Sequence, residues 1–125
     1  MSEGRPGHEL YAGLDVRAED TVLLKRRFSA FIAGSSDLEA RLRAGGYDTV
    51  IVTGTVTNIC CESTARDAMM LNFRTLMVSD ANAANSDAEH NATLVNVYQH
   101  FGDVMDTDTL VACLVRNAKA ALAAE

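Results

Sequence analysis

The stretch Val50–Ala68, VIVTGTVTNICCESTARDA, carries most of the information about the fold and the chemistry of this chain. Its β-branched, apolar start ends at Thr53-Gly54, which is typical of a buried strand followed by a turn. A few turn residues later, Cys60 falls at the expected first turn of a helix. The N–H groups and the positive dipole end of a helix start favour a thiolate and prepare an anion pocket. We therefore interpret Cys60 as a candidate nucleophile.

A buried cysteine that only packs is the alternative interpretation of Cys60, because free cysteine is among the most buried residue types. The position between a turn and a helix favours the reactive interpretation. Cys61 is one residue further along, so it points about 100° away around the helix. We expect Cys61 to pack in the core.

The composition predicts one globular domain with a real core. The chain has 125 residues, of which 48% are hydrophobic and 22% charged, within the ordinary range for a soluble domain. Its net charge of -6 argues against nucleic acid or a membrane surface as a partner. No apolar run approaches the ~18 residues of a membrane span, and no signal peptide is evident. We expect a cytoplasmic protein.

The three cysteines, Cys60, Cys61 and Cys113, have no regular spacing. Such a set is a poor disulfide framework and fits a reducing compartment. The adjacent pair also lacks the spacing of a zinc motif, and no glycine-rich nucleotide loop is present. We therefore expect neither a metal ion nor a cofactor.

Apolar runs and amphipathic segments alternate along the chain. The runs predict strands, and the amphipathic segments predict helices. The expected strands are residues 21–24, 48–53, 74–79 and 103–105, and the expected helices are residues 37–44, 58–71, 88–101 and 108–123. This alternation predicts an α/β fold in which parallel strands are joined by right-handed crossovers.

In such folds, functional sites form beyond the carboxyl ends of the strands. Lys25 follows the first expected strand, the Gly54–Cys60 turn follows the second, and Asp80 follows the third. We therefore expect these three to lie at one edge of the sheet. A surface charge is the alternative interpretation of Lys25, and Asp80 is the candidate in this chain for a catalytic carboxylate.

Three segments also match a family pattern in order and spacing. They are LLKRRFSAF at 23–31, TGTVTNICCESTARDA at 53–68 and VSDANAANSDAEHNATLVNVYQHFGDV at 78–104. Together they resemble the isochorismatase-like cysteine hydrolases, which include nicotinamidases, N-carbamoylsarcosine amidohydrolases and ureidoacrylate amidohydrolases. The resemblance covers residues 7–112 and implies a Rossmann-like parallel sheet sandwiched by helices.

The resemblance also implies a catalytic site. It places the nucleophile at Cys60 and the lysine of an Asp-Lys-Cys triad at Lys25. It further implies a cis peptide at Thr55-Val56 and an oxyanion hole formed by the backbone N–H groups of Val56 and Cys60. The implied reaction cleaves a C–N bond of a small amide or ureido compound through a thioester.

The family's catalytic Asp lies in a hydrophobic-D-x-Q segment, and no such segment occurs in this sequence. We therefore interpret residues 1–125 as a single domain that is amino-terminally truncated relative to the family. Either the chain is a hydrolase whose base comes from another chain or from a segment upstream of a misassigned start, or it is an inactive relative that acts as a binding or oligomerisation module. Both hypotheses predict a homo-oligomer, because an open sheet edge tends to pair with another chain.

Other polar and aromatic residues near these motifs have two interpretations each. Phe28 is a candidate substrate contact, with a core or interface position as the alternative. Asn58 is a candidate helix cap, with substrate contact as the second possibility. His90 is expected to be a structural histidine, and Glu62 and Arg66 form an ordinary helical pair.

Overall fold

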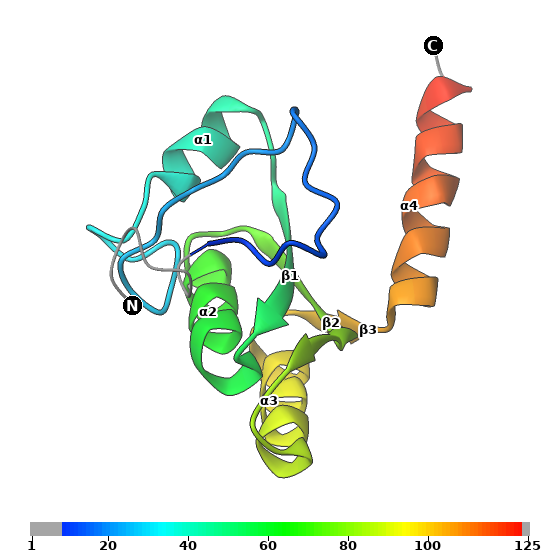
Figure 1. Ribbon diagram of the computed structural model, residues 1–125. Coiled ribbons are helices and arrows are strands. Elements are labelled where there is room, and N and C mark those ends of the chain that lie inside the picture. Colours follow the sequence, from blue (N-terminus) through cyan, green and yellow to red (C-terminus); the bar gives the residue numbers. More distant parts are fainter. Residues whose placement is uncertain (1–8, 124–125) are drawn as a thin grey trace.

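The computed structural model describes residues 9–123 and shows a parallel sheet with strand order β1-β2-β3 (Figure 1). The strands are β1 (Thr49–Thr55), β2 (Arg74–Ala83) and β3 (Asp103–Met105). The predicted α/β class and parallel pairing are confirmed, and the strand at 103–105 has the predicted ends.

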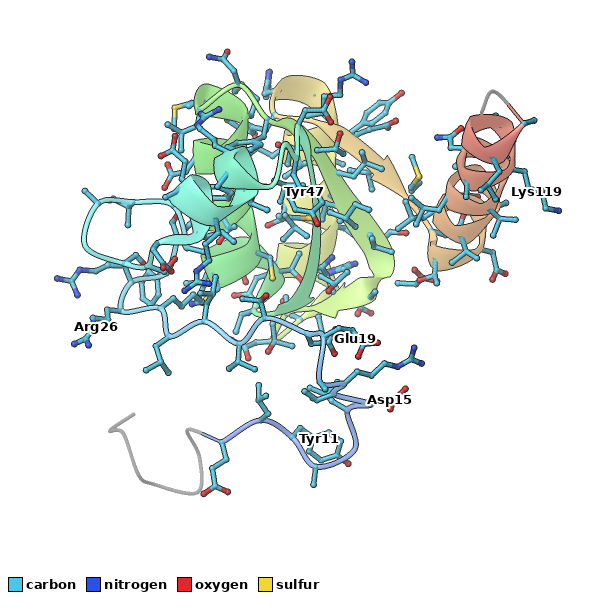
Figure 2. All side chains as sticks on the ribbon, turned by 90° about the horizontal axis from the view of Figure 1, so that it is seen from above. Tyr11, Asp15, Glu19, Arg26, Tyr47 and Lys119 are labelled. Carbon is cyan, nitrogen blue, oxygen red and sulfur yellow. The ribbon has the colours of Figure 1, made fainter. Side chains whose placement is uncertain are left out.

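Four helices flank this sheet. They are α1 (Leu38–Ala44), α2 (Glu62–Met70), α3 (Asp87–His100) and α4 (Thr107–Leu122). The two views show α2 and α3 on one side of the sheet and α4 standing on the other (Figures 1 and 2). No helix within residues 9–123 is long and apolar enough to cross a membrane.

Local sequence signals explain one end each of α3 and α2. Ser86 caps α3, since its Oγ accepts from the Glu89 N–H at 3.3 Å and donates to the Glu89 carboxylate at 2.9 Å. The first bond is the half of a capping box that the Ser-x-x-Glu spacing predicts, and the Glu89 carboxylate here binds the Ser86 hydroxyl in place of its N–H. After α2, Asn72 adopts a φ of 64°, the left-handed closing conformation predicted for it.

Two apolar clusters hold the layers together. The first joins both long strands to α2 and α3 through Val52, Cys61, Ala65, Met77 and Val97. The second joins α2 to the loop before α1 through Phe31, Ala68 and Phe73. The alanines of α2 are fully buried, so this helix lies close against the sheet.

The pairing of β1 with β2 is irregular near the carboxyl ends of the two strands. Val52 pairs with Met77, but Gly54 pairs with Asn82, so β2 makes a detour of several residues. The Asn82 Nδ2 fills this detour by donating to the carbonyls of Val52 at 3.0 Å and Val78 at 2.6 Å. The Asn82 side chain thus takes the place of backbone pairing near the carboxyl end of β1, where the sequence predicts the site.

Two sequence predictions about these elements are wrong. Residues 21–24 form no strand, and Val22 and Leu24 are 61% and 53% exposed. Strand propensity alone does not order such a run without a neighbouring strand to pair with. Asn58 does not cap the helix, because the helical turns already begin at Thr57, with Val56 in the cap position.

Candidate active site

Cys60 lies in a tight turn that connects β1 to α2. The turn is a single π-helical segment, Thr57–Cys61, in which the Val56 carbonyl accepts from the N–H groups of Ile59 at 3.1 Å and Cys61 at 3.2 Å. The peptide bond between Thr55 and Val56 is cis, at the position that the family resemblance implies. Cys60 is a half-buried free thiol in this turn, which immediately precedes α2.

Lys25 reaches this region from the loop before α1. Its Nζ donates to the carbonyls of Arg27 at 3.2 Å and Phe28 at 3.3 Å, so the ammonium is held by its own loop. That loop is internally braced, since the Ser35 hydroxyl donates to the Ser29 carbonyl at 2.5 Å. The ammonium group therefore belongs to an ordered segment.

Thr64 ties the loop to the cysteine turn. Its hydroxyl donates to the Cys60 carbonyl at 2.7 Å and accepts from the Ala30 N–H at 3.3 Å. The Thr64 side chain of α2 thus bonds both to the Cys60 backbone and to the loop that carries Lys25. Sequence reasoning missed this role, because a Thr inside a helix has no distinctive signal.

Lys25 and Cys60 lie on the walls of one cavity of about 250 Å³. The cavity runs along β1 and is otherwise lined mainly by apolar and hydroxyl side chains, namely Leu38, Val50, Ile51, Val52, Thr53, Thr55, Cys61 and Thr64. The structure therefore brings together the two residues that the sequence assigns to the catalytic centre. No carboxylate is among these lining residues.

The two adjacent thiols have different surroundings. Burial and, to a lesser extent, the neighbouring Cys60 raise the pKa of Cys61 from its ordinary value of 9.0 to about 11, against the lowering effect of the Lys25 charge. Cys61 is 4% exposed and belongs to the core, as predicted.

The two predicted substrate contacts, Phe28 and Asn58, do not line this cavity. Phe28 is 65% exposed and borders a separate hollow of about 410 Å³ beside Arg27, Arg66 and Met70. Asn58 is half-buried, and its Oδ1 is buried without a hydrogen-bond partner in the described residues.

Asp80 also lies outside the cavity and has a structural partner. Its carboxylate accepts from the Thr107 N–H at 2.9 Å and the Thr107 hydroxyl at 2.7 Å, which fastens the start of α4 to β2. These hydrogen bonds lower the pKa of Asp80. The structure therefore does not support Asp80 as the catalytic carboxylate.

Comparison with known proteins gives a consistent result. The sequence profile of a family described as the isochorismatase domain matches residues 1–109. The chain is 37% identical over 102 residues to nicotinamidase 3 of Arabidopsis thaliana, covering 82% of this chain and 50% of that protein. It is 33% identical over 120 residues to the ureidoacrylate amidohydrolase RutB of Yersinia enterocolitica, covering 95% of this chain and 51% of that protein. The chain thus spans about half the length of these relatives.

The fold is similar to that of solved structures, among them proteins described as isochorismatase-like or of the isochorismatase family. A cysteine hydrolase from Pseudomonas syringae pv. phaseolicola superposes with a TM-score of 0.84 at 33% identity. That match covers 89% of this chain and 56% of the other. Family profile, curated relatives and solved structures agree, so this chain belongs to the isochorismatase family of hydrolases.

Proposed function

We propose that this chain carries the nucleophile and the lysine of a cysteine hydrolase that cleaves a C–N bond of a small amide or ureido compound. The observation that carries this proposal is the placement of Lys25 and Cys60 on one cavity, above a turn with a cis peptide. The names of the relatives, a nicotinamidase and a ureidoacrylate amidohydrolase, support the substrate class.

The proposed reaction has two stages. The Cys60 thiolate attacks the substrate carbonyl, a C–S bond forms, and the oxyanion receives hydrogen bonds from the N–H groups of Val56 and Cys60. The C–N bond then breaks, and ammonia or an amine leaves with a proton. Water next attacks the thioester, the C–S bond breaks, and the acid leaves while the thiol is restored.

Lys25 has an electrostatic role in this scheme. Its ammonium shares the cavity with Cys60, so it favours the negatively charged thiolate over the thiol. A lysine held by two carbonyls keeps its position when the substrate enters. We assign the transfer of the proton to a carboxylate supplied by another segment of the full protein or by another chain, because the residues that line the cavity include none.

We infer that the assembly is a homo-oligomer in the cytoplasm. The three cysteines are free thiols, which suits a reducing compartment. β1 lies at the edge of the described sheet, so another chain can pair with it.

The alternative function is a binding or oligomerisation module without catalysis. The absence of a carboxylate among the lining residues of the Cys60 cavity favours this alternative. In that case the cavity keeps its shape but no group accepts the thiol proton.

Alkylation of Cys60 by iodoacetamide as a function of pH separates these two functions. For a catalytic site, we expect the rate to rise with a midpoint well below ~8.5, the ordinary value for a free thiol. Lys25→Met should move the midpoint upwards, whereas Lys119→Met, an exposed lysine of α4 labelled in Figure 2, should not. Cys60→Ser gives the background. The rate of an ordinary thiol would support the module.

A second experiment tests the substrate class. Release of ammonia is measured with nicotinamide and with ureido acids, at protein concentrations high enough to populate an oligomer. Turnover that is lost in Cys60→Ser would support the hydrolase, and no turnover with an activated thiol would point to a missing base.

A further inference from the structure

The contact between Thr57 and His90 is unexplained by the chemistry described so far. Thr57 is the first residue of the cysteine turn, and its side chain is fully buried. Its Oγ1 lies 3.0 Å from the Nδ1 of His90, which is on α3. Because an unpaired buried hydroxyl costs about 1–3 kcal/mol, this contact fixes the turn to α3.

A second contact fixes the other end of the same turn. Glu62, the residue after the turn, accepts from the Thr93 hydroxyl at 2.8 Å and from the Asn96 amide at 2.7 Å. His90, Thr93 and Asn96 are spaced by three residues, so they share one side of α3. This side of α3 therefore holds the chain immediately before and immediately after the segment that contains Cys60.

We propose that His90 and Thr57 form a positioning pair that sets the geometry of the cysteine turn and, through it, the reactivity of Cys60. Thr57 lies between Val56 and Cys60, whose N–H groups form the proposed oxyanion hole. A shift of the turn relative to α3 moves those donors away from the thiolate and the reacting oxygen. A displacement of about 1 Å at a reacting centre is enough for losses of up to 10²-fold.

Either ring form of His90 can make this contact. A bare Nδ1 accepts from the Thr57 hydroxyl, and a protonated Nδ1 donates to it. The pair therefore acts through position, without a proton transfer to the substrate. The effect of this pair on turnover rests on the proposed function, whereas its effect on the alkylation rate of Cys60 does not.

The test measures the alkylation rate of Cys60 with iodoacetamide at neutral pH in four single variants. Thr57→Val keeps the shape of the side chain without its hydroxyl, and Thr57→Ser keeps the hydroxyl. His90→Ala removes the ring, and His100→Ala is the matched control, since His100 is an exposed histidine at the end of the same helix.

We expect Thr57→Val and His90→Ala each to slow alkylation about tenfold, the scale of a modest misplacement. Thr57→Ser and His100→Ala should keep the wild-type rate. The double variant Thr57→Val/His90→Ala should be no slower than either single variant, because both remove the same contact. Circular dichroism confirms that each variant is folded, and His90→Asn replaces His90→Ala if the latter does not fold.

Several results would overturn this proposal. One is a wild-type rate in Thr57→Val or in the folded His90 variant, even with a lower melting temperature, because it would show a purely structural contact. Another is strictly additive slowing in the double variant. A wild-type thiol of ordinary reactivity that no variant changes would also contradict it.

Turnover separates this inference from the proposed function. If amide hydrolysis is found, Thr57→Val should lower kcat and leave KM nearly unchanged, since the pair acts on groups that engage the transition state. If no hydrolysis is found but the variants still slow alkylation, the positioning pair stands and the proposed function fails.

Discussion

At the scale of single residues, Cys60 and Cys61 show how two neighbours in one turn acquire different chemistry. Cys61 is buried in the first core cluster with a pKa near 11, whereas the half-buried Cys60 borders a cavity shared with a lysine. The sequence could predict this division, because a rotation of about 100° per residue separates adjacent positions on a helix. It could not show the depth of burial, which depends on the strands that pack against the turn.

The raised pKa of Cys61 predicts a loss of stability at high pH. Folding keeps this thiol protonated, so its contribution is complete below 9.0, its ordinary value, and is lost as the pH rises through about 11. The free energy of unfolding, measured by urea denaturation between pH 8 and pH 11, should fall more steeply in wild type than in Cys61→Ala. Equal slopes in the two proteins would contradict this explanation.

Gly102 lies so close to the β2 backbone that no side chain fits at this position. A Cβ at this position would lie 2.2 Å from the Thr75 carbonyl oxygen of β2, and backbone cannot move aside. We expect Gly102→Ala to lower the free energy of unfolding by about 1–3 kcal/mol. Gly45→Ala is the control, since its Cβ would crowd the exposed ring of Tyr47, which can move, and would lie at an ordinary 3.4 Å from the Arg41 carbonyl oxygen. Similar losses in both variants would argue against the clash.

At the scale of elements, one carboxylate links α2 to α3 alongside their apolar contacts. Glu62 receives hydrogen bonds from Arg66, Thr93 and Asn96. Burial alone would raise the pKa of Glu62, but these hydrogen bonds and the Arg66 charge together lower it. The sequence predicted the pair with Arg66, four residues along the helix. It could not predict the partners on α3, which lie more than 30 residues away along the chain.

Removal of this carboxylate should cost stability. We expect Glu62→Gln to lower the free energy of unfolding by about 1–3 kcal/mol at neutral pH, because a charged acceptor of several donors is lost. Since folding lowers this pKa, the contribution is complete above 4.5 and is lost as the pH falls below it. The difference between wild type and Glu62→Gln should therefore shrink in acid.

The matched control for Glu62→Gln is Glu39→Gln. Glu39 pairs with Arg43 at 2.9 Å with the same helical spacing, but the Glu39 side chain is 36% exposed, against 14% for Glu62. Exposed pairs contribute about 0–1 kcal/mol. An equal effect of the two substitutions, measured by denaturant titration, would show that the contacts to α3 add nothing.

The elements also show where sequence reasoning succeeds and fails. Periodicity located α1, α3 and α4, and apolar runs located β1 and β2, with end shifts of a few residues. The prediction of a strand at 21–24 failed because a strand requires a neighbouring strand to pair with, which the apolar pattern does not reveal. The placement of Lys25 beside Cys60 came from the family resemblance, since the lysine alone resembles a surface charge. The contact of His90 with Thr57 gave no local signal.

At the scale of the whole molecule, β1 is one of the two edge strands of the described sheet, and it borders the Cys60 cavity. The strand order places it at one end, and Ile51 remains 38% exposed beside the Cys60 cavity. An unpaired edge of this kind is a template for pairing with another chain. The sequence predicted self-association from the open edge, and this stays a prediction.

Self-association through β1 has a direct test. We expect the weight-average mass in sedimentation equilibrium to rise with concentration for wild type and to stay at that of a monomer for Ile51→Lys, because a charge beside an edge strand opposes pairing. Val95→Lys, at a 55% exposed position on α3, should behave as wild type. Association that survives Ile51→Lys would place the contact elsewhere.

The detour of β2 around Asn82 has a consequence for how this fold can vary. The side chain of Asn82 bridges the break in the ladder between Val52 and Gly54, and backbone pairing resumes where Gly54 pairs with Asn82 and Thr55 with Ala83. Residues 79–81 thus leave the β1 ladder, and Asp80 among them holds the start of α4. A change of length in this segment should shift α4 and leave the pairing of Ile51 with Leu76 in place, so the position of this helix can be altered without rebuilding the sheet.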